Sequence, residues 1–251
     1  MLTDYSSQAQ TSNQNLSTII NSPIETPKRI ELKHEIPTGH ENSFLKNMFK
    51  SSLLIRECYP ARIINSIYFD TLTLSTFDES ISGNQIRQKH RIRWYETPSE
   101  KSPITYEIKY KNSHLSWKLL HKSDHHINLD ATLWDNLFIN QKGIQDLCLA
   151  SLLNLHPVSL VSYERSYYES WDGKIRITID YQISFRNQRL LGRPNFDIFS
   201  YHRRSSIMEM KFAEEDFDLA KNLQRTVRIK PQRFSKYCES VSANNYSNRK
   251  S

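Results

Sequence analysis

The chain has 251 residues, 37% of them hydrophobic, and a formal net charge of +7 at pH 7. This length suits one large domain or two small ones, and a hydrophobic share rich in Phe, Tyr and Trp is sufficient for a core. No apolar run approaches the roughly 18 residues of a membrane-spanning helix, and the N-terminus lacks a signal-peptide pattern. The basic balance favours a polyanionic partner, namely nucleic acid, a phosphate-rich small molecule or an acidic membrane surface.

The three cysteines, Cys58, Cys148 and Cys238, are widely separated. Their spacing contains no CxxC motif and no zinc-ligand pattern. We therefore interpret them as reduced core thiols and expect a cytoplasmic protein.

The first half of the chain predicts a leader followed by alternating strands and helices. Residues 1–27 are rich in Ser, Thr, Asn and Gln and are predicted to be disordered. Alternation predicts strands over 29–36, 63–69 and 89–95, and helical spacing predicts an amphipathic helix over 41–55. The segment 73–80 is ambiguous and is compatible with a short helix, and 82–84 is a turn.

The second half predicts more strands and two terminal helices. Residues 97–103 read as a hairpin loop, with strands at 104–111, 158–168, 174–180 and 206–212 and a possible strand at 116–120. Helical spacing recurs over 130–155 and 214–227, and a last helix is expected to open near residue 233. Residues 186–205 are interpreted as a polar loop or irregular strand, and residues 242–251 as a loose polar tail.

The strands share an unusual polar face. Side chains alternate between the two faces of a strand, so Lys89, Arg91 and Arg93 point one way while Ile92 and Trp94 point the other. At least five predicted strands carry such a charged face, and Arg and Lys dominate it. Three like charges in a row repel one another unless water or an anion neutralises them.

Two arrangements of these strands are compatible with the pattern. If the apolar faces point inward, the chain forms an ordinary barrel or sheet with a basic outer face. If the apolar faces point outward under helices, the charges line a central tunnel. The tunnel requires a concentrated anion such as triphosphate or polyphosphate, because buried like charges are otherwise costly.

Seven ordered blocks of this chain resemble the VTC domain, the polyphosphate-polymerase branch of the triphosphate tunnel metalloenzymes. No block is specific alone, but their order is, and the resemblance favours the tunnel arrangement for a domain over residues 28–241. The blocks are Asn65-Ser66-Ile67-Tyr68-Phe69-Asp70-Thr71, His90-Arg91-Ile92-Arg93-Trp94-Tyr95, Tyr106-Glu107-Ile108-Lys109, Tyr163-Glu164-Arg165, Arg176-Ile177-Thr178-Ile179-Asp180, Met208-Glu209-Met210-Lys211-Phe212 and Phe234-Ser235-Lys236-Tyr237-Cys238.

The resemblance implies an α+β fold, an antiparallel closed β-barrel with helices packed outside. It implies transfer of the terminal phosphoryl group of ATP to a growing polyphosphate chain, dependent on Mn²⁺ or Mg²⁺. By position, the catalytic residues would be Lys33, Arg91, Arg93 and Lys236. The substrate-binding residues would be Lys89, Lys109, Lys111, Arg165, Arg176 and Lys211. Glu209 matches the metal-binding glutamate, and Glu107 either assists it or pairs with lysines.

One departure from the superfamily concerns the first strand. Related tunnel hydrolases begin with Glu-x-Glu-x-Lys, whereas this chain has Glu31, Lys33 and Glu35 in a different order. The difference argues against the tripolyphosphate and thiamine-triphosphate hydrolases, which hold metal with the paired glutamates.

Other functions stay open at this point. They are a tunnel triphosphatase or polyphosphatase, a catalytically silent polyphosphate sensor, and a nucleic-acid binder. A silent sensor would not require Glu209 and Lys236, and a nucleic-acid binder should place stacking aromatics beside the basic residues. We expect ATP and polyphosphate as partners, no nucleic acid, and any membrane coupling through a separate protein.

Several residues have simpler interpretations. We expect Trp94, Trp117, Trp134 and Trp171 to serve in packing, and His34, His90, His125 and His126 to be surface or packing residues. Asp70 follows a strand and is expected to cap its end.

Overall fold

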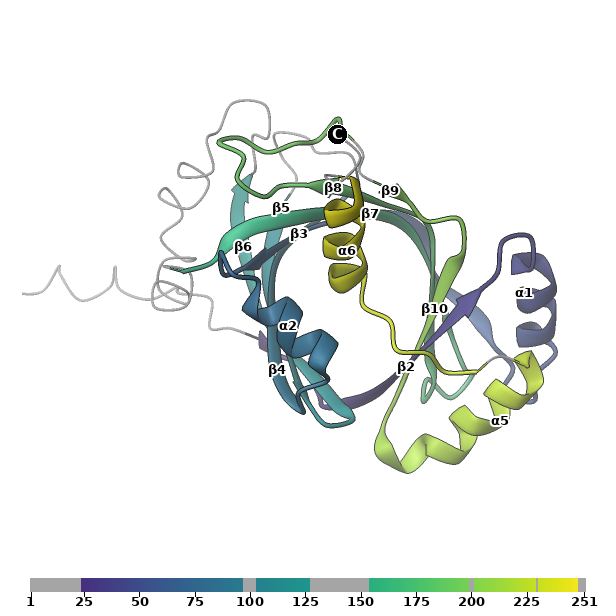
Figure 1. The fold of residues 1–251 in the computed structure, drawn as a ribbon. Coiled ribbons are helices and arrows are strands. Elements are labelled where there is room, and N and C mark those ends of the chain that lie inside the picture. The colour runs from purple at the N-terminus through teal and green to yellow at the C-terminus, as the bar shows by residue number, and fades with distance from the viewer. Residues whose placement is uncertain (1–23, 97–102, 127–153, 199–200, 229, 248–251) are drawn as a thin grey trace, which may run out of the picture.

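A computed structural model of the chain describes residues 24–96, 103–126, 154–198, 201–228 and 230–247 (Figure 1). The predicted leader up to residue 23, most of the hairpin loop and nearly all of the predicted helical segment 130–155 lie outside these ranges. The strands are β1 (Ile24–Glu25), β2 (Arg29–Ile36), β3 (Arg56–Asp70), β4 (Ile86–Tyr95), β5 (Pro103–Asn112), β6 (Leu115–His126), β7 (His156–Glu169), β8 (Arg176–Asn187), β9 (Tyr201–His202) and β10 (Ser206–Phe212). The helices are α1 (Glu41–Phe49), α2 (Ser75–Ser82), the 3₁₀ turn η1 (Glu214–Asp216), α5 (Phe217–Val227) and α6 (Lys236–Ser247).

The strands close into an antiparallel ring. Hydrogen bonding runs in the order β6-β2-β10-β8-β7-β3-β4-β5, and β5 pairs again with β6. The ring is uneven, because β2 meets β6 at only two residue pairs, Arg29 with Ser116 and Ile30 with Leu115. The short strand β1 extends this seam by pairing with Leu119 and Leu120 of β6.

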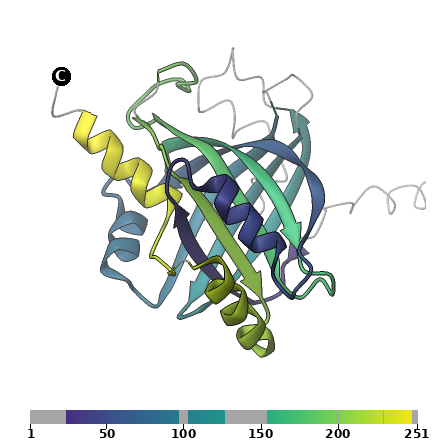
Figure 2. The ribbon, with the colours of Figure 1, turned by 90° about the vertical axis from the view of Figure 1, so that its right-hand side faces the viewer.

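Apolar side chains on the outside of the ring hold two helices against it. Phe44 and Met48 of α1 and Leu223 of α5 are buried over β2, β8 and β10, together with Ile177 and Met210. Figure 2 shows α1 and α5 lying across these strands. Because the apolar faces point outward, the charged faces point into the ring, so the tunnel arrangement is correct and the basic outer face is wrong.

Part of the ring interior is apolar, and α6 packs there. Before Gln182, Ile177 and Ile179 of β8 face outward, whereas Ile183 and Phe185 join an interior cluster with α6. The change of face coincides with a register shift against β7 and with a left-handed φ of 50° at Gln182. In Figure 1, α2 and α6 lie across one opening of the ring.

Several predicted boundaries are wrong. Strand β1, at residues 24 and 25, lies inside the predicted disordered leader, because these residues pair with β6. Helix α1 ends at Phe49 rather than near 55, and β3 begins at Arg56 because it pairs with the end of β7 across bulges. Helix α6 continues to Ser247, into the predicted loose tail, because Val241 and Asn244 are buried against the ring. The predicted polar segment 186–205 contains the end of β8 and strand β9.

Candidate functional site

The ring encloses a central cavity of about 420 Å³. Side chains of two glutamates line it, and twelve Lys and Arg residues surround them. The cations are Lys33, Arg87, Lys89, Arg91, Arg93, Lys109, Lys111, Lys118, Arg165, Lys211, Arg233 and Lys236, and the glutamates are Glu31 and Glu209. Two further buried carboxylates, Glu107 and Asp180, hold some of these cations. Even with all four carboxylates counted, the cavity has a large excess of positive charge.

Glu107 of β5 gathers three cations. Its Oε2 accepts hydrogen bonds from Arg91 Nε at 2.9 Å and Lys118 Nζ at 3.0 Å, while Oε1 lies 3.0 Å from Arg93 Nη1. Burial alone would raise the pKa of Glu107, but the charges of Arg91, Arg93 and Lys118 hold that pKa well below its usual range. Glu107 is therefore an anion that fixes the two arginines, so its predicted pairing role is supported over a metal role.

Asp180 of β8 joins the ring to α6. Its two oxygens accept from Arg165 Nε at 2.5 Å and Nη2 at 2.8 Å, and Oδ2 also accepts from Lys236 Nζ. Asp180 is fully buried, and although burial favours its neutral form, the two cations lower its pKa. The position of Lys236 on α6 is thereby tied to that of Arg165 on β7.

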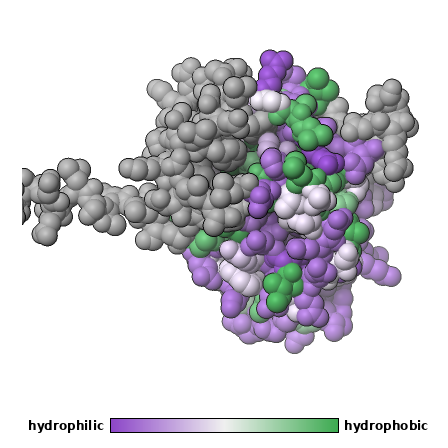
Figure 3. All heavy atoms as spheres, turned by 60° about the vertical axis from the view of Figure 1, so that its left-hand side comes forward, coloured by the Kyte–Doolittle hydropathy of each residue, from purple (hydrophilic) through white to green (hydrophobic). Residues whose placement is uncertain are grey.

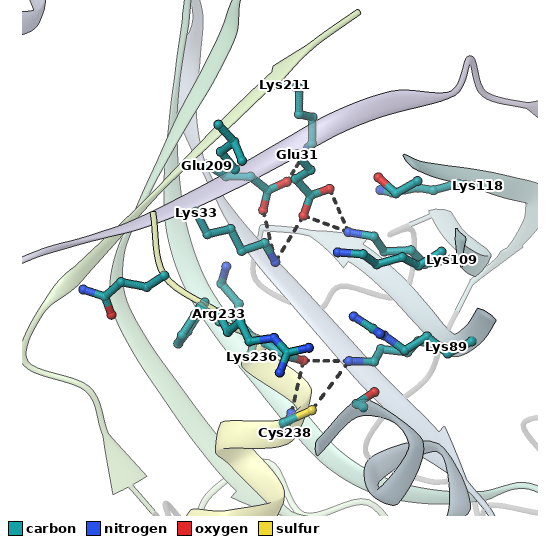
Figure 4. Close-up of a pocket in the computed structure, with 18 of the residues that line it drawn as sticks. Glu31, Lys33, Lys89, Lys109, Lys118, Glu209, Lys211, Arg233, Lys236 and Cys238 are labelled. Carbon is teal, nitrogen blue, oxygen red and sulfur yellow. Dashed lines mark hydrogen bonds and ion pairs between the residues drawn. The ribbon is translucent and has the colours of Figure 1, made fainter. Parts of the chain in front are cut away.

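Lysines bridge the two cavity glutamates (Figure 4). Lys33 Nζ lies 3.1 Å from Glu31 Oε1 and 3.7 Å from Glu209 Oε2. Lys109 donates to both oxygens of Glu31 at 2.8 and 2.7 Å, and Lys211 lies 2.6 Å from Glu209 Oε1. Glu31 and Glu209 repel each other, yet the surrounding lysines keep the pKa of both carboxyls below the usual value.

The same pair of carboxylates is where a divalent cation would fit. Within the described ranges, no group of three or more His, Cys, Asp and Glu side chains gathers as a metal site. Mg²⁺ commonly takes only one or two protein carboxylates and completes its shell with substrate phosphates and water. Glu209 and Glu31 meet that requirement, since both face the cavity and share Lys33.

A second group of lining cations lies at one end of the cavity, where the start of β4 and the end of β5 approach the end of α2 and the segment before α6. We take this end as the mouth of the cavity. We call Arg87, Lys89, Lys111 and Arg233 the mouth cations, and the eight other lining cations the inner cations. None of the four mouth cations has an ion pair with a described carboxylate. Lys89 Nζ donates to Ser235 Oγ at 2.8 Å and contacts Cys238 Sγ at 3.6 Å, and burial lowers its pKa. Gly83, with φ of 78°, ends α2 and leaves room for the guanidinium of Arg233.

Aromatic side chains support the inner cations. Tyr68 Oη accepts from Arg91 Nη1 at 2.9 Å, and Tyr163 Oη lies 3.4 Å from Arg93 Nη2. The ring of Phe234 lies 6.0 Å from Lys33 Nζ and 5.6 Å from Lys236 Nζ. These rings keep the cations in place without neutralising them.

The structure brings together ten of the eleven predicted site residues. All except Arg176 line the cavity. Arg176 shares the inward face of β8 with Asp180 but is the first residue of that strand and is exposed, so it lies outside the cavity lining. Glu35 also lies outside the lining and pairs with Arg203 at 2.6 Å.

Sequence reasoning missed Lys118, Arg87, Arg233 and Asp180. Lys118 stands opposite Lys109 in the β5–β6 pairing, so a firm assignment of β6 would have placed it on the charged face. Arg87 is two residues before Lys89, which is the same alternation one step earlier. Arg233 comes from a segment without regular structure, and no sequence period indicates where it points.

Most of the simpler interpretations are confirmed where the described residues test them. The packing role expected for Trp171 is wrong, because its side chain is 68% exposed, with the Arg56 guanidinium 5.1 Å from its ring centroid. Asp70 accepts from the backbone N–H groups of Thr71, Thr76 and Phe77 and so caps both the end of β3 and the start of α2. Trp94 is buried in the outer core. His34 and His90 are buried packing residues, and Trp134 lies outside the described residues.

Comparison with known proteins supports this description. No curated protein sequence matches the chain. Among solved structures, the PH1819 protein from Pyrococcus horikoshii OT3 is 14% identical, with a TM-score of 0.50 over 85% of this chain and 98% of that one. A Hippeastrum protein, described as an adenylyl cyclase candidate with a dominant triphosphatase activity, is 13% identical, with a TM-score of 0.52 over 85% and 95% of the two chains.

At such identities these structures show a shared fold and nothing more. The family, in contrast, is identified by sequence, because the model of the VTC domain matches residues 28–245, which is most of the chain. The match begins where sequence reasoning placed the domain and ends four residues later, within α6. The chain belongs to the VTC domain family.

Proposed function

We propose that this protein is a polyphosphate polymerase, which transfers the terminal phosphoryl group of ATP to a growing polyphosphate chain inside the central cavity. The observation that carries the proposal is the charge of the cavity, where twelve Lys and Arg side chains face two lining glutamates. Burying so many like charges is unfavourable unless a polyanion neutralises them. A triphosphate joined to a phosphate chain matches that requirement.

The residues suit phosphoryl transfer. A terminal oxygen of the polyphosphate attacks the γ-phosphorus of ATP, the bond from that phosphorus to the bridging oxygen breaks, and ADP leaves with the electron pair. Such a reaction needs placement and charge stabilisation more than covalent help. Arg91 and Arg93, fixed by Glu107, would hold phosphate oxygens through their guanidinium forks, and Lys236 of α6 and Arg165 of β7 would do so beside them.

A divalent cation is part of the proposal. Mn²⁺ or Mg²⁺ held by Glu209, with Glu31 beside it, would neutralise charge that develops on the transferred group. Lys33, Lys109 and Lys211 contact these carboxylates and would then be released to bind phosphate oxygens. Glu31 and Glu209 would thus pair with the lysines in the absence of metal and with the metal once it binds.

The location of the cations disfavours nucleic acid. They lie inside a ring of strands, whereas a nucleic-acid surface presents its cations on an open face.

None of the helices in the described part of the chain has the length and apolar character needed to cross a bilayer. Hydrophilic residues predominate over the described part of the face in Figure 3. We keep the expectation of a cytoplasmic protein, with any membrane coupling supplied by another protein.

The experiment is to incubate the purified protein with ATP and Mn²⁺ and to separate the products on a gel stained for polyphosphate. A ladder of long chains with matching ADP release is the expected result. Release of inorganic phosphate without chains would instead assign a tunnel triphosphatase, in which water attacks. Tight polyphosphate binding without either product would leave a sensor, and each of these two results overturns the polymerase.

A further inference from the structure

Three consecutive residues of α6 each contact the cavity machinery. Lys236 pairs with Asp180, and Cys238 contacts Lys89. Tyr237, between them, is 1% exposed and lies in the interior apolar cluster rather than in the cavity lining. Neither the sequence pattern nor the proposed chemistry gives Tyr237 a role, yet its side chain has contacts on two sides.

In one direction Tyr237 reaches α2. Its hydroxyl donates to Asp70 Oδ2. Asp70 is fully buried and also accepts from Thr76 N and Phe77 N, both at 2.9 Å, at the start of α2. Burial and the Asp70 carboxylate raise the pKa of Tyr237, so the hydroxyl keeps its proton and remains the donor. This single carboxylate therefore joins β3, α2 and α6.

In the other direction Tyr237 reaches an inner cation. Its ring stacks on that of Tyr68, with centroids 5.3 Å apart and planes inclined by 28°. Tyr68 Oη accepts from Arg91 Nη1 at 2.9 Å, and the guanidinium carbon of Arg91 lies 5.7 Å from the Tyr68 ring centroid. Lys89 Nζ lies 5.6 Å from the Tyr237 ring centroid.

We propose that Tyr237 is a positioning residue for phosphoryl transfer, which docks α6 on Asp70 and, through the stacked Tyr68, sets the orientation of Arg91. The proposal rests on the proposed function and deepens it, because it makes the catalytic geometry depend on how α6 is seated. Arg91 already has Glu107 on one side. Tyr68 fixes its other side, and Tyr237 is the aromatic neighbour that holds the Tyr68 ring in place.

The test compares Tyr237→Phe and Tyr237→Leu with Tyr168→Phe. Tyr168 is also a buried tyrosine, but it packs outside the ring against Phe49, with centroids 5.8 Å apart. Tyr237→Phe keeps the stack and removes the hydroxyl, whereas Tyr237→Leu removes both. We expect kcat to fall about threefold in Tyr237→Phe and at least about tenfold in Tyr237→Leu, with KM for ATP changed by a smaller factor than kcat in each variant. Tyr168→Phe, at a matched melting temperature, should retain kcat.

A binding cycle separates this proposal from the proposed function. The affinity for tripolyphosphate is measured by calorimetry for Arg91→Ala in the wild-type background and in Tyr237→Phe and Tyr237→Leu. If Tyr237 sets the orientation of Arg91, the loss caused by Arg91→Ala shrinks at least about threefold in the leucine background. Equal losses in all three backgrounds would overturn the coupling, whatever the enzyme activity.

The outcomes of the two measurements differ for each failure. A wild-type protein without turnover overturns the polymerase, while the binding cycle still decides on Tyr237. If Tyr237→Leu does not fold, Tyr237→Phe carries the test, with the same signs and smaller sizes. Normal kcat in a folded Tyr237→Leu would refute the positioning role.

Discussion

The inner cations and the mouth cations occupy one cavity but are held differently. The inner cations share four carboxylates, Glu31, Glu107, Asp180 and Glu209. The mouth cations have no carboxylate partner in the described chain, and Lys89 is held by a hydroxyl and a thiol instead. A cation held by a buried carboxylate keeps its place when the substrate is absent, whereas one without a partner depends on the ligand for neutralisation.

The difference suggests a division of labour. Fixed charges lower the reorganisation needed at the reacting phosphorus, which is where catalysis gains most from preorganisation. Mouth charges that have no carboxylate partner suit a chain whose phosphates pass one after another. Variants that change one charged group at a time therefore test whether the inner cations and the mouth cations differ in function.

The largest effect should come from Glu107→Gln. It leaves the buried Arg91 and Arg93 and the partly buried Lys118 without their carboxylate, and breaking a buried charge cluster in this way costs about 3–5 kcal/mol of unfolding free energy. Chemical denaturation measures the loss. Added tripolyphosphate should restore more stability to the variant than to the wild type, because it supplies the missing negative charge.

A matched control for that variant is Glu169→Gln. Glu169 also pairs with an arginine, Arg56 at 2.8 Å, but half of the Arg56 side chain is exposed. An exposed pair of this kind contributes about 1 kcal/mol or less. Equal destabilisation by the two variants would show that Glu107 stabilises the fold no more than an exposed carboxylate does.

The second effect concerns metal. Glu209→Gln should lower Mn²⁺-dependent turnover by about a hundredfold or more, because the carboxylate that holds the cation is lost. Binding of tripolyphosphate without metal should stay nearly unchanged or strengthen, since Lys33 and Lys211 lose a competing anion. Release of ADP in the presence of Mn²⁺ measures turnover, and calorimetry without Mn²⁺ measures tripolyphosphate binding. The control is Glu35→Gln, because the Glu35 carboxylate pairs with Arg203 outside the cavity lining. Full turnover in Glu209→Gln would remove Glu209 from the metal site.

These charge groups were partly predictable from sequence. Alternation of Lys89, Arg91 and Arg93 placed three cations on one face, and the ordered resemblance indicated that this face lines a cavity. Alternation along a strand cannot show which carboxylate pairs with which cation. Asp180 of β8, for example, pairs with Lys236, which lies 56 residues later in the chain, on α6. Arg176 shows the same limit, since its face was correct but its position at the strand end decides its exposure.

The boundaries failed for a related reason. The first part of β3, from Arg56 to Arg62, is mostly exposed and carries no apolar alternation, and it is a strand only because β7 pairs with it. The change of face at Gln182 depends on a bulge, which no periodic pattern contains. Contacts between segments far apart in the sequence thus determine where these strands begin and which face their side chains occupy.

The third effect concerns substrate binding by the inner arginines. Arg91→Ala should weaken tripolyphosphate binding about tenfold to a hundredfold, the range expected when a charged hydrogen-bond donor is removed from a buried site. Arg176→Ala should change it less than about twofold, because that guanidinium is exposed outside the cavity lining. Titration calorimetry at fixed salt compares the two. A large loss in Arg176→Ala would restore the role that the family resemblance implied for it.

The smallest effect should appear at the mouth. Arg87→Ala should leave stability unchanged, because its guanidinium donates only to the Asn84 carbonyl oxygen at 2.5 Å and pairs with no described carboxylate. Binding of long polyphosphate should weaken about twofold to threefold and its salt dependence should flatten, while tripolyphosphate held by the inner cations should bind as before. Arg225→Ala, on the exposed face of α5, removes the same charge far from the mouth and should change neither ligand. If Arg87→Ala weakens both ligands equally, the mouth and inner cations act as one site, and their different carboxylate contacts have no separate functional meaning.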